Sequence, residues 1–125
     1  MVLIIDTDHE AVEISRMVLE NAFDVITAST GERGLALAFE RRPFMVLLDS
    51  CLPGLDGHRI CKLLRSQDET RDVLIVFLSS VTDREAIERC FASGADDFIV
   101  KPFGGRELVD KIWQLLMKKK AETVK

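Results

Sequence analysis

The sequence has few cysteines, no excess of basic residues and no long hydrophobic run. Its three cysteines, Cys51, Cys61 and Cys90, include no Cys-x-x-Cys pair, which argues against a disulfide framework or a zinc site. With 17 basic and 21 acidic residues the net charge is -4, so the chain as a whole lacks the electrostatic footprint of a nucleic-acid-binding protein. The apolar runs, such as residues 73–78, are far too short to span a membrane, and no signal-peptide pattern opens the chain. We therefore expect a cytoplasmic protein with reduced thiols that binds neither nucleic acid directly nor a membrane.

What the sequence does contain is the composition of one globular domain. Hydrophobic residues make up 47% and charged residues 30% of its 125 residues, a balance typical of folded domains. Five short apolar segments do not alternate with polar residues and are mostly rich in β-branched side chains; they are residues 2–5, 25–26, 45–48, 73–78 and 98–100. Unbroken runs of this length favour strands covered on both faces, as in a parallel sheet. We expect one domain over residues 1–125.

Segments with helical spacing separate these strands. Their apolar positions share a helical face in each case: Ile14, Met17 and Val18; Ile60, Leu63 and Leu64; Ile87, Cys90 and Phe91; and Leu108, Ile112, Leu115 and Leu116. Capping-box sequences predict helix starts at Thr7, Ser29 and Thr82. Asp56 is expected to cap the third helix and Gly94 to end the fourth. The alternation predicts an α/β fold, a three-layer sandwich with a five-stranded parallel sheet and five helices.

The chemistry of such a sheet is expected outside the carboxyl ends of its strands. The residues that follow the apolar runs there are Asp6-Thr7-Asp8, Asp49, Ser79-Ser80 and Lys101-Pro102. Two carboxylates at one sheet edge repel each other unless a cation lies between them, and the candidates are Lys101 and a bound metal. Oxygen ligands without histidine favour Mg²⁺. A carboxylate beside a divalent ion, a lysine and a hydroxyl can accept a phosphoryl group as an acyl phosphate.

Two segments resemble the signatures of a known family, the receiver domain of two-component response regulators. Residues 47–57, Leu-Leu-Asp-Ser-Cys-Leu-Pro-Gly-Leu-Asp-Gly, are similar to its phosphoacceptor segment, and residues 98–103, Phe-Ile-Val-Lys-Pro-Phe, to its lysine–proline segment. The resemblance covers essentially the whole chain and takes the form of a stand-alone single domain. It implies the flavodoxin-like strand order 2-1-3-4-5.

The resemblance also implies a role for each site residue. Asp49 resembles the phosphorylated aspartate, Lys101 the phosphate-binding lysine and Ser79 the switch hydroxyl, although Ser80 beside it leaves open which serine faces the site. Asp6, Asp49 and the backbone carbonyl of Cys51 correspond to ligands of Mg²⁺. Phe98 resembles the switch aromatic. The alternative that Phe98 is an ordinary core residue stays open. The Lys101–Pro102 bond corresponds to one that the family holds in cis.

The implied function is a signalling switch and not an enzyme beyond self-phosphorylation and slow self-dephosphorylation. A sensor histidine kinase or histidine phosphotransfer protein would supply the phosphoryl group. The changed surface would be that of the fourth helix, fifth strand and fifth helix, which would bind a downstream protein. Only a polar tail, residues 121–125, follows the fifth helix, so we expect this domain to act by binding.

One position departs from the family pattern, which has two adjacent acids after the first strand. Thr7 stands where the second acid is expected, so we predict weaker Mg²⁺ binding than in a receiver with two acids, with phosphorylation at high Mg²⁺. Asp8 is a further candidate ligand, and its alternative role is that of an acid at a helix N-terminus. Two other hypotheses stay open. One is a receiver-like interaction module that is not phosphorylated. The other is a haloacid-dehalogenase-type phosphatase with Asp6 as nucleophile, although Glu10 does not fit that family's motif.

Overall fold

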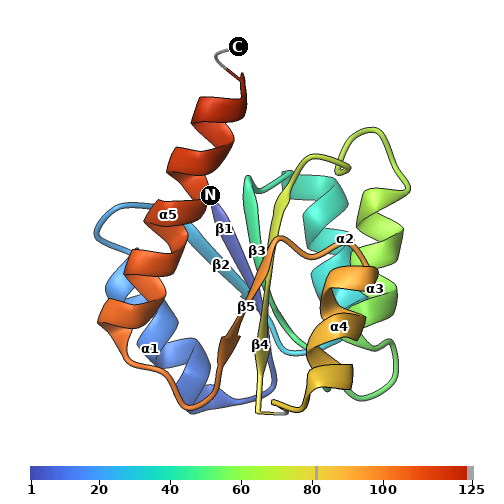
Figure 1. Ribbon diagram of the computed structural model, residues 1–125, viewed down its shortest axis with the longest axis horizontal. Helices are drawn as coiled ribbons and strands as arrows, with labels where there is room; N and C mark the ends of the chain where they lie inside the picture. Colours follow the sequence, from blue (N-terminus) through green and yellow to red (C-terminus); the bar gives the residue numbers. More distant parts are fainter. Residues whose placement is uncertain (81, 124–125) are drawn as a thin grey trace.

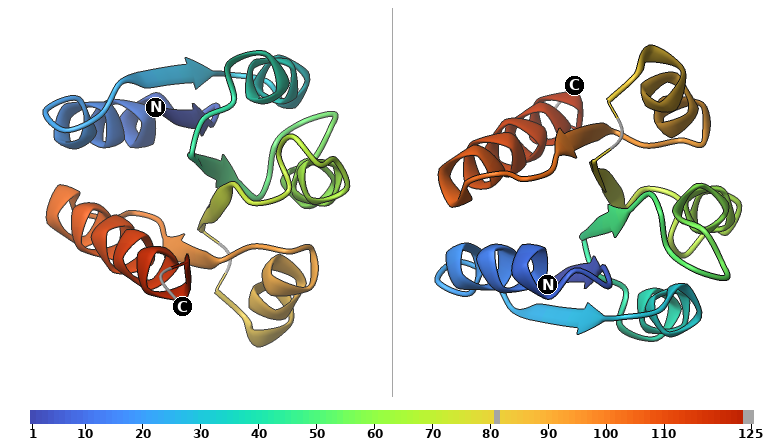
Figure 2. Two further views of the ribbon diagram at one scale, coloured as in Figure 1. Left: turned by 90° about the horizontal axis from the view of Figure 1, so that it is seen from above. Right: turned by 90° about the horizontal axis from the view of Figure 1, so that it is seen from below.

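The computed structural model describes residues 1–80 and 82–123 and places five parallel strands in one sheet, in the order β2-β1-β3-β4-β5. The strands are β1 (Val2–Ile5), β2 (Val25–Ala28), β3 (Met45–Asp49), β4 (Leu74–Ser79) and β5 (Asp97–Val100). The helices are α1 (His9–Leu19), α2 (Gly31–Arg41), α3 (Gly57–Arg65), α4 (Arg84–Ala92) and α5 (Gly105–Thr123). Helices α1 and α5 cover one face of the sheet, and α2, α3 and α4 cover the other (Figure 1, Figure 2). The predicted three-layer sandwich and strand order are confirmed.

Alternate residues of each strand face opposite helical layers, because side chains along a strand point to the two faces in turn. In β1, Val2 and Ile4 join the core under α1 and α5, whereas Leu3 and Ile5 join the core under α2, α3 and α4. All four side chains are completely buried. Burial on both faces is the physical reason that the strands appear in the sequence as unbroken apolar runs.

Three helices begin one residue later than their capping-box sequences predict. The N-caps are Asp8, Thr30 and Asp83 in place of Thr7, Ser29 and Thr82. Each observed cap has an extended backbone, and its side-chain oxygen accepts a hydrogen bond from an N–H of the first helical turn. This geometry decides which residue is the cap, although the preceding residue fits the capping-box motif. Two further end predictions are confirmed: Asp56 caps α3, and Gly94 follows the end of α4 with a φ of 109°.

For two helical residues the prediction of a buried position is wrong. Met17 is 70% exposed and Phe91 is 45% exposed. In α1 the buried positions are Ala11, Ser15 and Leu19, spaced four residues apart, so the buried face is rotated away from Met17. Helical spacing predicted these helices correctly but gave the wrong centre for the buried face.

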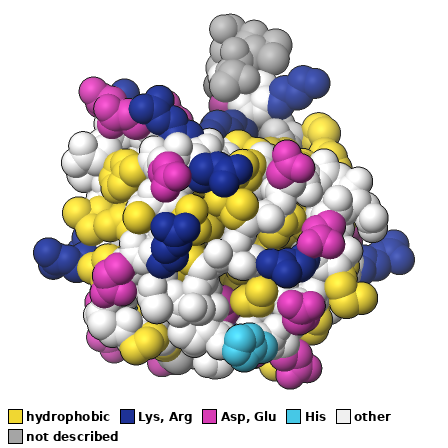
Figure 3. Space-filling model, turned by 180° about the vertical axis from the view of Figure 1, so that it is seen from behind, with side chains coloured by type: hydrophobic (Ala, Val, Ile, Leu, Met, Phe, Trp, Pro, Cys, Tyr) yellow, Lys and Arg dark blue, Asp and Glu magenta, His cyan; other side chains and the backbone are white. Residues whose placement is uncertain are grey.

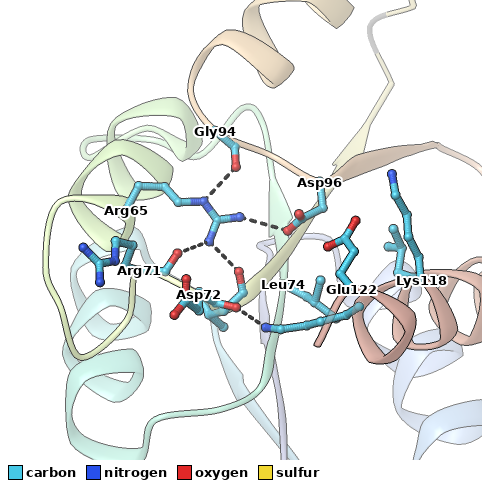
Figure 4. Close-up of a pocket in the computed structure, with 11 residues that line it drawn as sticks. Arg65, Arg71, Asp72, Leu74, Gly94, Asp96, Lys118 and Glu122 are labelled. Atoms are coloured by element: carbon cyan, nitrogen blue, oxygen red, sulfur yellow. Dashed lines mark hydrogen bonds and ion pairs between the residues drawn. The ribbon is translucent and has the colours of Figure 1, made fainter. Parts of the chain in front are cut away.

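A cavity of about 510 Å³ lies at the amino-terminal edge of β4 and β5 and is lined mainly by charged residues (Figure 4). The Arg65 guanidinium dominates it: Nε donates to Gly94 O at 2.8 Å, and another nitrogen pairs with Asp96 at 2.9 Å. It also donates to the carbonyls of Arg71 and Val73. These contacts connect α3 to the loops before β4 and β5. The charged residues of this cavity therefore stabilise the fold.

The surface carries charges of both signs. On the face seen in Figure 3, basic and acidic side chains are interspersed and do not gather by sign. Within residues 1–80 and 82–123, no helix combines the length and the apolar character that a membrane crossing requires.

Candidate functional site

Three charged residues meet at the carboxyl edge of the sheet. Ile5 of β1 is paired with Leu48 of β3, so Asp6, just after β1, lies beside Asp49, the last residue of β3. Lys101 follows β5, and its backbone N–H donates to Ser79 O at 2.8 Å. The alternation of each strand places these three side chains on the same side of the sheet as α1 and α5.

The Lys101 ammonium lies among three carboxylates. Its Nζ is 2.7 Å from Asp6 Oδ2, 3.8 Å from Asp49 Oδ2 and 3.9 Å from Asp8 Oδ2. The side chain of Asp6 is completely buried, and those of Asp49 and Lys101 are 10% and 13% exposed. Lys101 is therefore the cation that two close carboxylates were expected to require.

Asp6 is the more deeply buried of the two central carboxyls. Burial raises its pKa above the ordinary value of 3.8, and the negative charge of Asp49 adds to this. Contact with Lys101 and a hydrogen bond from the Asp8 N–H, 2.9 Å long, act in the opposite direction. Lys101 and the Asp8 N–H thus hold the Asp6 carboxyl in place, and its burial leaves it poorly placed to attack a substrate.

Asp49 has access to solvent through a cavity of about 340 Å³. Its Oδ1 accepts a hydrogen bond from the Cys51 N–H at 3.1 Å, which fixes the carboxylate in the turn after β3. The cavity is lined by polar residues, among them Ser80 and Lys101, and by apolar residues such as Ile14 and Phe103. A small reactant can therefore reach Asp49 beside the ammonium of Lys101.

The two serines after β4 lie in different surroundings. Ser80 lines the Asp49 cavity and is exposed, whereas Ser79 is 3% exposed and lines a smaller cavity of about 160 Å³ between α3 and α4. The Ser50 hydroxyl donates to the Ser79 hydroxyl at 3.0 Å. Phe98 is half-buried, and its ring packs edge-on against Phe91 with centroids 6.0 Å apart.

The loop after β1 holds the departure from the expected acid pair. Thr7 is exposed and Asp8 is the N-cap of α1, its Oδ1 accepting from the Glu10 and Ala11 N–H groups at 3.0 and 3.4 Å. The other Asp8 oxygen turns towards Lys101, so this residue both caps the helix and borders the site. Among residues 1–80 and 82–123, no group of three or more histidine, cysteine or acidic side chains is arranged to hold a metal ion.

Sequence reasoning missed two residues near the site, Ser50 and His58. The His58 ring stacks on Phe77 with centroids 5.1 Å apart, and its Nε2 is 3.8 Å from Cys90 Sγ. Burial lowers the pKa of His58, and the charge of Arg89 adds to the effect. A signal was available, because His58 lies three residues before the buried Cys61 on the same face of α3.

The chain belongs to the response regulator receiver domain family, whose model matches residues 2–113. It is 35% identical to the DNA-binding dual master transcriptional regulator RpaA of Synechocystis, over 92% of this chain and 48% of that protein. It is 38% identical to the DNA-binding response regulator MtrA of Mycobacterium tuberculosis strain H37Rv, over 89% of this chain and 48% of that protein. The chain thus spans about half the length of these curated relatives.

Solved structures agree with the family. A putative response regulator from Chloroflexus aurantiacus superposes with a TM-score of 0.87 at 33% identity, covering 93% of this chain and 96% of that one. The chemotaxis protein CheY4 of Vibrio cholerae gives a TM-score of 0.85 at 26% identity, covering 90% and 95%. The recognised resemblance is confirmed, and the cis Lys101–Pro102 bond that it implied is present. Family membership and the burial of Asp6 both count against the phosphatase hypothesis.

Proposed function

We propose that residues 1–125 form a receiver domain that accepts a phosphoryl group on Asp49 from a phosphohistidine of a sensor histidine kinase or histidine phosphotransfer protein. Receiver domains of response regulators serve phosphorylation-dependent signalling, and the match to that family supports the proposal. The observation that carries it is the position of Asp49: its carboxylate borders an open cavity and lies 3.8 Å from the Lys101 ammonium.

The proposed step is a transfer between two nucleophiles. A carboxylate oxygen of Asp49 forms a bond to phosphorus while the phosphorus–nitrogen bond to the donor imidazole breaks, and the imidazole leaves with that electron pair and takes up a proton. Lys101 balances negative charge on the phosphoryl oxygens. A serine hydroxyl, from Ser79 as the family resemblance implies, donates a hydrogen bond to one of them.

Mg²⁺ is the proposed cofactor. Asp6, Asp49 and the backbone carbonyl of Cys51 would hold it, since all three offer the hard oxygen donors that this ion prefers. Bound there, the ion would neutralise charge on the transferring group. The donor chemistry fits, but Thr7 adds no charge and one Asp8 oxygen is engaged in capping α1. We therefore propose weaker Mg²⁺ binding than in a receiver with two adjacent acids.

The proposed output is a changed protein-binding surface. Phosphorylation adds roughly one further negative charge and new acceptor oxygens at Asp49. Ser79 and Phe98 would reorient around them and shift the population towards a second packing of α4, β5 and α5. Phe91 and Val100, 45% and 38% exposed, offer apolar contact area on that surface. We propose that this domain acts in the cytoplasm through protein contacts, without binding DNA itself and without turnover chemistry.

Incubation with acetyl phosphate and Mg²⁺, followed by intact-mass measurement, tests the proposal. We expect one phosphoryl group on the wild type and none on Asp49→Asn, which keeps the shape of the side chain. A wild type that gains no phosphoryl group, at any Mg²⁺ concentration up to tens of millimolar, would refute phosphotransfer. That result would favour the second candidate, a receiver-like interaction module, which the neutral and exposed Thr7 supports.

A further inference from the structure

Two serine hydroxyls bond to each other on the face of the sheet opposite Asp49. In β3, Met45 and Leu47 join the core under α1 and α5, and Asp49 continues that alternation. In β4, Ile75 and Phe77 join the core under α2, α3 and α4, and Ser79 continues theirs. The Ser79 hydroxyl therefore lies on the α3–α4 side, where it accepts the bond from Ser50.

Ser50 is held firmly in this position. Its N–H donates to Leu78 O at 3.2 Å, and the first turn of α3 packs against its backbone so closely that a Cβ on Gly57 would lie 3.2 Å from Ser50 Cα. Ser50 and Ser79 are only 8% and 3% exposed, so water does not easily replace their hydrogen bond. A fixed donor thus favours one orientation of the Ser79 hydroxyl.

We propose that Ser50 is a positioning residue that holds the Ser79 hydroxyl away from Asp49 and so lowers the fraction of molecules ready to bind a phosphoryl group. The inference rests on the proposed function of Asp49 and Ser79. To reach a phosphoryl oxygen on Asp49, Ser79 must turn from the α3–α4 side and lose the Ser50 bond. A ligand that requires a minor state binds with an affinity reduced by the population of that state.

The test is the affinity for beryllofluoride, a mimic of the phosphoryl group, in the presence of Mg²⁺. Ser50→Ala removes the donor, and we expect the half-saturating beryllofluoride concentration to fall by about 2- to 10-fold, the range that corresponds to one net hydrogen bond. The rate of phosphorylation by acetyl phosphate should rise by a similar factor. Ser50→Thr keeps the hydroxyl and should retain the wild-type value.

Two further variants separate positioning from a general effect on stability. Ser15→Ala removes another buried hydroxyl, which donates to Ala11 O within α1, and should leave beryllofluoride affinity unchanged. In a Ser79→Ala background, Ser50→Ala should have no further effect, because its partner is gone. Unchanged or weaker binding by Ser50→Ala, or an equal effect in both backgrounds, would overturn the inference and leave the proposed function intact. A wild type that neither binds beryllofluoride nor accepts a phosphoryl group would overturn both.

Discussion

Removal of the Lys101 charge is the most direct test of the site's electrostatics. Lys101→Met keeps most of the aliphatic stem and deletes the ammonium. At 2.7 Å from Asp6 and an effective dielectric constant of about 20, the lost attraction is roughly 6 kcal/mol before the cost of desolvating the charges is considered. Deleting one partner of a buried ion pair costs about 3–5 kcal/mol in practice. Because Lys101 is 13% exposed, we expect the lower end, a loss of about 3 kcal/mol in the free energy of unfolding.

The assay is urea unfolding at pH 7 in EDTA, followed by circular dichroism and by the fluorescence of Trp113, the single tryptophan. Lys111→Met is the matched control, since Lys111 pairs with Asp97 at 3.1 Å but the two side chains are 30% and 24% exposed. For this partly solvated pair we expect a loss below about 1 kcal/mol. A Lys101→Met variant as stable as the Lys111→Met control would refute the buried ion pair.

The dependence on pH gives a second check on the same variant. Burial already raises the pKa of Asp6 above its unfolded value of 3.8, and removal of Lys101 should raise it further. A raised folded-state pKa means that the folded protein binds the extra proton, so the deficit of Lys101→Met should shrink as the pH falls through that pKa. Asp6→Asn combined with Lys101→Met should recover part of the loss at pH 7, because the completely buried side chain at position 6 then carries no charge that needs the missing ammonium.

Three further predictions concern other parts of the molecule. Thr7→Asp should lower the Mg²⁺ dissociation constant roughly tenfold by calorimetry, because it adds a carboxylate beside the ion. The wild-type free energy of unfolding should fall as the pH drops below 6.5, the ordinary pKa of histidine, because burial and the charges of Arg89 and Lys62 lower the folded-state pKa of His58 despite Asp56. His58→Gln should flatten this slope in pH-dependent urea unfolding. Arg65→Lys should cost about 2–3 kcal/mol in the same assay at pH 7, because one ammonium cannot replace a guanidinium that donates to four acceptors on two loops at once.

Each of these has a control in the chain. Thr7→Asn adds no charge and should leave Mg²⁺ binding as it is; an equal effect of Thr7→Asp and Thr7→Asn would contradict the electrostatic reason. A pH slope that persists in His58→Gln would assign it to another group. Arg71→Lys should change stability by less than about 0.5 kcal/mol, since its pair with Asp68 is largely exposed. An equally small change for Arg65→Lys would show that its contacts contribute little.

The sequence alone determined the layers of the fold and the residues at the carboxyl edge of the sheet. Val2–Ile5 and Met45–Leu48 are apolar at every position because both faces of a central parallel strand are buried, and this pattern is local. A charged residue that directly follows or ends such a run, as Asp6 and Asp49 do, must lie at the edge of the sheet, because the strand ends there. Alternation with helices then fixes the layers, and a resemblance to the receiver family supplied the strand order.

Tertiary structure decided how those edge residues meet. That Lys101 contacts Asp6 more closely than Asp49, and that Ser79 faces Ser50, depends on strand pairing and side-chain direction, for which neighbouring residues in the sequence carry no signal. The exposure of Met17 has the same origin: helical period sets which residues share a face, but the neighbouring elements set which face is covered. Local pattern encodes burial along each element, whereas the site is made of contacts between elements.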